Sequence, residues 1–71
     1  MTPDEQQAAD KLRTIIQNRY PDLSPSVGDG AMGVTITLGV DQARFSEIEA
    51  AMQDGTMEVM LDTGILIMLS P

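Results

Sequence analysis

The residues of this 71-residue chain that could do chemistry are its eleven Asp and Glu residues, because the chain contains no histidine and no cysteine. A serine or cysteine nucleophile is usually activated by histidine, and structural zinc is held mainly by cysteine and histidine. Both kinds of site are therefore excluded within the chain. Among the carboxylates, Asp62 stands out because it lies in the apolar stretch VMLDTGILIML, residues 59–69.

The segment LDTGI, residues 61–65, resembles the signature with which retroviral-type aspartic proteases present a catalytic aspartate. The resemblance implies acid–base catalysis by Asp62 in a symmetric dimer, where a pair of aspartates shares a proton. In that family a flap and several further strands follow the motif, whereas here seven residues follow Gly64. We therefore expect that the protease fold is not completed, and we interpret Asp62 as the corner of a turn.

Two further patterns suggest phosphate or metal binding, and we interpret neither as a site. GDGAMG, residues 28–33, has the glycine spacing of a dinucleotide-binding turn. Such a turn follows a strand and opens a helix, whereas this stretch follows a predicted loop and precedes a strand pattern. Glu47 and Glu49 lie two residues apart on an expected helix, so they face different directions. We expect no catalytic residue, no cofactor and no metal site, and hence no enzyme.

The first element that the sequence predicts is a helix at the N-terminus. In the segment TPDE, Thr2 can cap the helix and Glu5 completes a capping box three residues later. Apolar residues then recur at helical spacing until Pro21, which disfavours helical geometry in the residue before it. We expect this helix to end near Arg19.

The segment PDLSPSVGDG, residues 21–30, is rich in proline, glycine and serine and is predicted to be a loop. It is longer than the usual connection of about 4–6 residues, and long loops carry function more often than short ones. Both a functional loop and a plain connection fit this pattern. The polar candidates of a functional loop are Asp22, Ser24, Ser26 and Asp29.

A strand and a second helix are expected next. The segment AMGVTITLGV, residues 31–40, alternates apolar and small or polar residues, which is typical of a strand with one buried face. Asp41 is placed to cap a helix over residues 42–53, and Gly55 to end it. The apolar face of the strand consists of Met32, Val34, Ile36, Leu38 and Val40.

The last two segments predict a hairpin of residues 56–61 and 65–69, with residues 62–64 as its turn. In this register Leu61 pairs with Ile65, Val59 with Ile67, and Met57 with Leu69. All of these residues are apolar and lie on one face, which we expect to face the helices. A three-residue turn of this kind favours glycine in the left-handed conformation at its third position, which is Gly64.

Together these elements predict a single α+β domain over residues 1–71, with the order α-β-α-β-β. The connection between the first two strands should be right-handed, which makes them parallel. The last strand is apolar on both faces and therefore belongs in the centre. We expect a two-layer fold with a three-stranded mixed sheet of spatial order 1-3-2 and both helices on one face.

The net charge of −7 and the pI near 4.1 limit the partners. An acidic chain gains nothing from counterion release on nucleic acid, so direct binding of nucleic acid is not expected. The first residues do not form a secretory signal, and the longest apolar run is too short to span a bilayer. We expect a cytoplasmic protein without membrane contact or an evident small-molecule substrate.

Self-association or a protein partner is expected, because domains below about 70–80 residues seldom obtain more than about 3–5 kcal/mol from one core. In the predicted sheet, a second face carries apolar residues that two helices cannot cover, which is typical of a contact surface. The predicted interface residues are Met60, Leu66, Met68, Thr35 and Thr37.

Our leading hypothesis is therefore a small non-catalytic interaction module, acting as a homodimer or as a subunit or adaptor of a larger partner. The alternative is an acidic inhibitor, of the kind encoded by phages or mobile elements. Its carboxylates would stand in for phosphates in the basic groove of a nucleic-acid-binding enzyme. The predicted row of carboxylates consists of Asp41, Glu47, Glu49 and Asp54.

Overall fold

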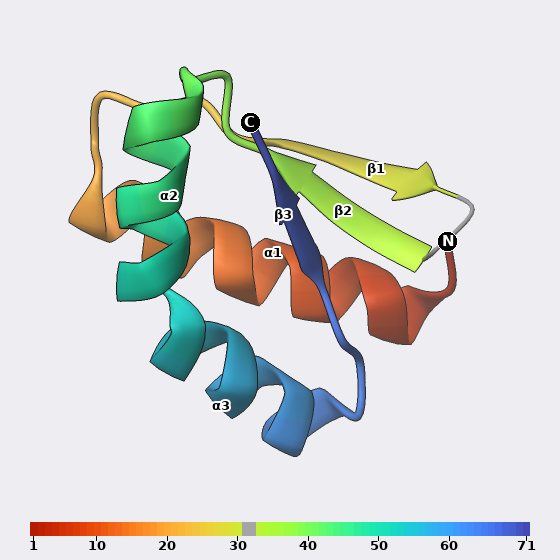
Figure 1. Cartoon of the computed structure of the whole chain (residues 1–71). Coiled ribbons are helices and arrows are strands. Elements are labelled where there is room, and N and C mark those ends of the chain that lie inside the picture. The colour runs from red at the N-terminus through yellow and green to blue at the C-terminus, as the bar shows by residue number, and fades with distance from the viewer. Residues whose placement is uncertain (31–32) are drawn as a thin grey trace.

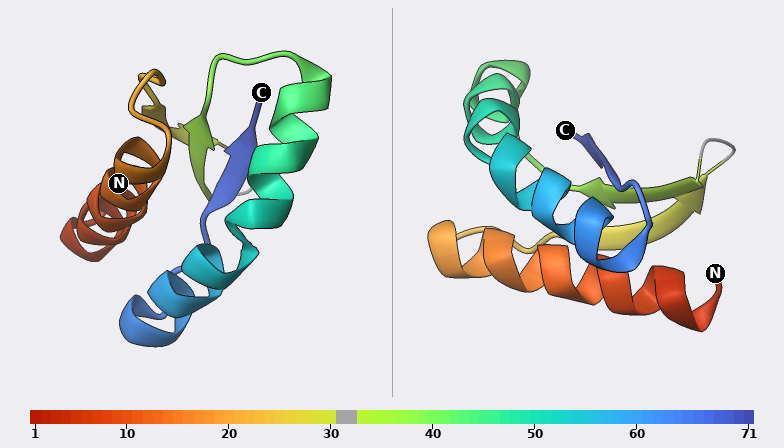
Figure 2. Two further views of the ribbon diagram at one scale, coloured as in Figure 1. Left: turned by 90° about the vertical axis from the view of Figure 1, so that its left-hand side faces the viewer. Right: turned by 90° about the horizontal axis from the view of Figure 1, so that it is seen from below.

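A computed structural model describes residues 1–30 and 33–71, and over these residues the chain forms three helices and a three-stranded sheet (Figure 1). In chain order the elements are α1 (Pro3–Arg19), β1 (Ser26–Gly30), β2 (Gly33–Thr37), α2 (Gln42–Ala51), α3 (Gln53–Thr63) and β3 (Met68–Ser70). α1 lies across one face of the sheet and α3 runs beside α1, whereas α2 stands beside β3 (Figure 2).

The first helix begins and ends where the sequence predicts. The hydroxyl of Thr2 accepts a hydrogen bond from the backbone amide of Glu5 at 3.2 Å, and the carboxylate of Glu5 accepts one from the amide of Thr2 at 2.9 Å. These bonds satisfy two amides that lack partners within the helix. The helix ends at Arg19, and its buried residues are Ala8, Ala9, Leu12 and Ile16.

The α+β class with a mixed three-stranded sheet is confirmed, but the order of the strands is not the predicted one. The observed order is β1-β2-β3, with β2 in the centre, antiparallel to β1 and parallel to β3. The predicted order 1-3-2 instead placed the last strand in the centre and antiparallel to its neighbours. The predicted loop over residues 21–30 contains β1. Its sequence, SVGDG, has Val27 as its one large apolar residue, so backbone pairing with β2 defines this strand rather than side-chain alternation.

The buried face of β2 is the predicted one. Val34 and Ile36 are buried, as is Leu38 just after the strand. Leu69 of β3 pairs with Ile36 in register and therefore lies on the same face of the sheet. Met32, which was predicted for this face, lies outside the described residues.

The predicted hairpin over residues 56–69 is wrong, because residues 56–61 belong to α3. The hairpin register required Leu61 to be buried, but its side chain is 78% exposed, whereas Val59 is buried. Met52 is buried as well, and its separation from Val59 is close to two helical turns. Burial at this spacing is typical of a helix. Residues 57, 59 and 61 are also apolar at alternate positions, which is why the sequence predicted a strand here.

Two glycines show how the chain continues as a helix beyond its expected end. Gly55, predicted to end the second helix, lies within α3 and faces α1. A β-carbon at this position would lie 3.0 Å from the Cε of Met52 and 3.7 Å from the Cγ2 of Ile15. A β-carbon here would therefore meet α1 at an ordinary contact distance and would crowd the methyl group of Met52. The left-handed residue that ends the helix is Gly64, with φ of 75°.

Substitutions at Leu61 and Val59 distinguish the helix from the hairpin. Leu61→Lys should change the free energy of unfolding by no more than about 0.5 kcal/mol, because the side chain is exposed. Val59→Ala should cost about 1–3 kcal/mol, because Val59 is buried. Urea denaturation measures both values. A large loss with Leu61→Lys would contradict the helix.

A pH dependence is expected from the ion pair between Asp22 and Arg44, which joins the segment after α1 to α2 across 2.8 Å. The hydrogen bond from Arg44 lowers the pKa of Asp22 below its ordinary value of 3.8. Asp22 therefore contributes stability that is complete above pH 3.8 and is lost as the pH falls through the folded pKa.

The difference in unfolding free energy between the wild type and Asp22→Asn should accordingly be small and positive near neutrality, since the pair is exposed. This difference in unfolding free energy should shrink below pH 3.8. The variant Arg44→Gln should show the same difference from the wild type and the same pH dependence. Denaturant titrations across this pH range measure it. A difference that grows on acidification would contradict the pairing.

Candidate functional site

An apolar groove of about 360 Å³ opens between the two C-terminal helices and the segment that leads into β3. One wall comes from the end of α2 and the exposed side of α3, and the other from residues 66–69. The lining residues are Glu49, Gln53, Thr56, Met57, Met60, Leu66, Ile67, Met68 and Leu69.

The groove follows the edge of β3 rather than one face of the sheet. Successive side chains of an extended segment point to opposite faces, so a site on one face would be lined by alternate residues. Here four consecutive residues, 66–69, all line the groove. β2 occupies the other edge of β3. The groove therefore lies along the edge that faces away from β2.

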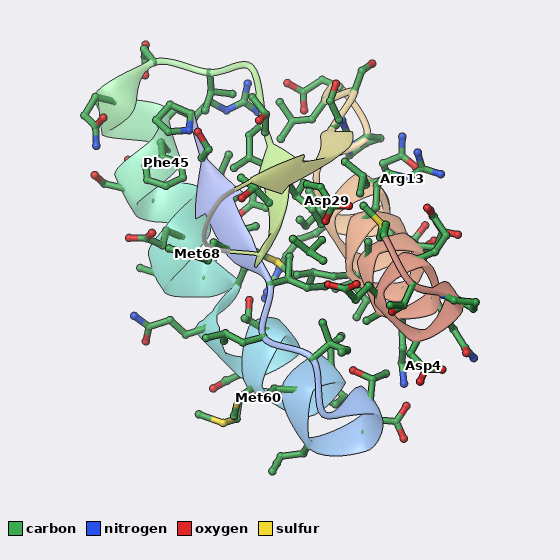
Figure 3. The ribbon with its side chains drawn as sticks, turned by 90° about the vertical axis from the view of Figure 1, so that its right-hand side faces the viewer. Asp4, Arg13, Asp29, Phe45, Met60 and Met68 are labelled. Carbon is green, nitrogen blue, oxygen red and sulfur yellow. The ribbon has the colours of Figure 1, made fainter. Side chains whose placement is uncertain are left out.

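The walls of the groove carry large apolar side chains that are in contact with solvent. Leu66 is 61% exposed, Met57 is 53% exposed and Met68 is 44% exposed, and Met60 is partly exposed beside them. Met60 projects from α3 and Met68 from β3 (Figure 3). Methionine side chains are flexible and polarisable, and they adapt to partners of irregular shape. The site is suited to binding apolar side chains of another molecule.

Three of the five predicted interface residues gather in this groove: Met60, Leu66 and Met68. Thr35 pairs with Met68 in register, so it lies beside the groove on the open face of the sheet. Thr37 lies farther along that face and is exposed. The expected surface was the second face of a hairpin, whereas the observed one is a strand edge with a helical wall.

The contribution of α3 to the groove was missed in the sequence. Met57 was predicted to face the core, but it is exposed in the groove. Met57 and Met60 are three residues apart, a spacing that places two side chains on neighbouring positions of one helix face. This spacing was the available signal, and it was obscured because the same residues also fit an alternating strand.

Asp62 makes a contact that was expected neither for a catalytic aspartate nor for the corner of a turn. It lies in the last turn of α3, and its carboxylate forms an exposed ion pair with Lys11 of α1 at 2.5 Å. The hydrogen bond from Lys11 to Asp62 raises the pKa of Lys11 above its ordinary value of 10.5. Asp62 is therefore a helix residue that contacts α1, and the prediction that it forms a hairpin corner is wrong.

The four carboxylates of the predicted acidic row do not lie on one line. Asp41 caps α2 by accepting a hydrogen bond from the amide of Arg44 at 2.8 Å, as the sequence predicts. Glu47 and Glu49 lie two residues apart on α2 and project in different directions. Asp54 belongs to α3. Of the four, Glu49 lines the apolar groove.

Two polar candidates in residues 21–30 form ion pairs with other parts of the chain. Asp22 pairs with Arg44, as described above. The carboxylate of Asp29 in β1 forms an ion pair with the N-terminal amine of Met1 at 2.8 Å. The hydrogen bond from this amine to Asp29 raises the pKa of the amine above 8.0. Ser24 and Ser26 make no side-chain hydrogen bond with the residues that the structure describes.

The positive charges of the chain are engaged away from the groove. Lys11 and Arg44 pair with Asp62 and Asp22, and Arg13 lies 3.8 Å from Asp10. Arg19 donates to the carbonyl oxygen of Ala51 at 3.0 Å, at the end of α2. The groove lining contains Glu49 and no cationic side chain. Its electrostatic environment is therefore negative.

Within residues 1–30 and 33–71, no group of three or more acidic residues is arranged to hold a metal ion. None of the helices in this described part is long and apolar enough to cross a bilayer. Comparisons with protein families, with curated protein sequences and with solved structures found no match.

Mild oxidation should distinguish the groove methionines from the core methionine. Met57 and Met68 are exposed and Met52 is 0% exposed, so hydrogen peroxide should oxidise the first two at least ten times faster than Met52. Peptide mapping by mass spectrometry measures the three rates. Equal rates in the folded protein would contradict this description, and denaturant should abolish the difference.

Proposed function

We propose that this protein is a small non-catalytic interaction module that binds a protein partner, either a larger protein or a second copy, through the groove beside β3. The supporting observation is the contiguous set of solvent-exposed apolar side chains on both walls of the groove. Scattered exposed hydrophobic residues are common on soluble proteins, but gathering them in one concave site is typical of contact surfaces.

The size of the domain gives a second reason for this proposal. With no disulfide and a core built from thirteen described residues, the fold has few sources of stability. Covering Met57, Leu66 and Met68 would remove apolar surface from water and stabilise the bound state by mass action. The expected mode of action is assembly with a partner.

The chain offers a matched pair of variants for testing the groove. Leu66 lines the groove, whereas Leu61 is also a highly exposed leucine but lies outside the lining. Leu66→Glu should weaken self-association or partner binding at least tenfold, since it places a charge on an apolar wall. Leu61→Glu adds the same charge and should leave binding within about twofold of wild type.

Light scattering across a salt series measures self-association, and capture of partners from cell extract followed by a binding titration measures assembly with another protein. Circular dichroism checks that both variants remain folded. If Leu66→Glu binds as tightly as Leu61→Glu, the groove is not the interface. If that result comes with affinity that falls steeply with salt, it would instead favour acidic mimicry through Glu47, Glu49 and Asp54.

A further inference from the structure

The outer edge of β3 has backbone groups that are positioned to pair with another strand. In a β-strand, the N–H and C=O of one residue point to the same edge, and those of the next residue to the opposite edge. The carbonyl oxygen of Ser70 accepts a hydrogen bond from the amide of Leu38 at 2.9 Å, so Ser70 faces the β2 side. By alternation, Leu69 and then Ile67 direct their N–H and C=O groups to the groove side.

No backbone bond joins Ile67 or Leu69 to the residues that the structure describes outside the sheet ladder. An edge strand with unpaired groups is a template for adding another strand, unless charge, proline or a covering element protects it. Here the neighbouring side chains are apolar, and the end of α2 and the exposed side of α3 form the wall of the groove opposite residues 66–69. The site therefore combines a backbone template with pockets for side chains, as in strand-addition interfaces.

The charge of the protein distinguishes between two possible occupants of this edge. A second copy would bring together two chains of net charge −7, with Glu49 at each groove. A segment with Lys or Arg would instead meet a surface whose own cations are engaged elsewhere, at Asp10, Asp22, Asp62 and the carbonyl of Ala51. Charge complementarity favours the cationic segment.

We propose that the groove binds a short extended segment of a partner protein, which adds as a strand to the free edge of β3. The segment alternates apolar residues, which enter the groove between Met57, Met60 and Leu66, with Lys or Arg residues, which face the acidic surroundings. Residues 66–69 span about 13 Å at the usual rise of a strand, enough to pair with about four partner residues. This inference rests on the proposed function and adds the mode of binding and the chemistry of the partner.

A short synthetic peptide of alternating lysine and valine tests this mode. Added to the ¹⁵N-labelled full chain, it should shift the amide signals of Ile67 and Leu69 and slow their hydrogen exchange. A peptide of the same sequence, N-methylated at every residue, keeps its charge and side chains but loses the backbone donors on both edges. It should bind about tenfold more weakly, since each lost hydrogen bond contributes modestly. A version with glutamate in place of lysine should not bind.

Equal binding of the N-methylated peptide would overturn strand addition, as would amide shifts confined to residues away from 66–69. Equal binding of the glutamate peptide would overturn the charge preference. Exchange protection of Ile67 and Leu69 in the free protein that rises with its concentration would identify a second copy as the occupant and also overturn the proposal. If strand addition fails while Leu66→Glu still abolishes assembly, the groove remains the interface and only the mode of binding is wrong.

Discussion

The packing of α3 against α1 is the constraint on which the arrangement of the C-terminal half depends. Glycine within a helix costs about 1 kcal/mol relative to alanine. A β-carbon at Gly55 would lie at ordinary contact distances from Ile15 and Leu12 of α1, 3.7 and 3.9 Å, and would crowd the Cε of Met52 at 3.0 Å. The packing of α3 on α1 buries Met52 and Val59 in the core. Burying a side chain of this size stabilises by about 1.5–3 kcal/mol, which exceeds the cost of the glycine.

The position of α3 also determines the surface that the protein presents. Because Val59 faces the core, Met57 and Met60 lie toward the groove, and the chain must return from Gly64 to reach β2 as a parallel strand. β3 is consequently a short edge strand with a helical wall beside it. An apolar edge left open in this way is a hazard for aggregation unless a partner covers it, which is consistent with a protein that acts in assemblies.

The sequence correctly predicted the helix starts that depend on hydrogen bonds between residues close in the chain. The capping box of Thr2 and Glu5 and the cap at Asp41 were found from neighbouring residues. The left-handed conformation of Gly64 was predicted for a hairpin turn, whereas Gly64 ends a helix. The hairpin was wrong because residues 57–61 fit both a strand and a helix, and the choice depended on α1, which is distant in sequence. Predicted interface residues such as Leu66 nevertheless line the groove. An apolar residue that does not face the core is exposed whether residues 56–61 form a strand or a helix.

The most direct test of this account is the solution environment of Gly55, measured by NMR of the full chain. The account predicts helical Cα chemical shifts across residues 53–63 and nuclear Overhauser contacts between the α-protons of Gly55 and the methyl groups of Leu12 and Ile15. Extended chemical shifts at residues 57–61, together with cross-strand contacts between Val59 and Ile67, would contradict it. In that case the groove beside β3 would not exist in this form.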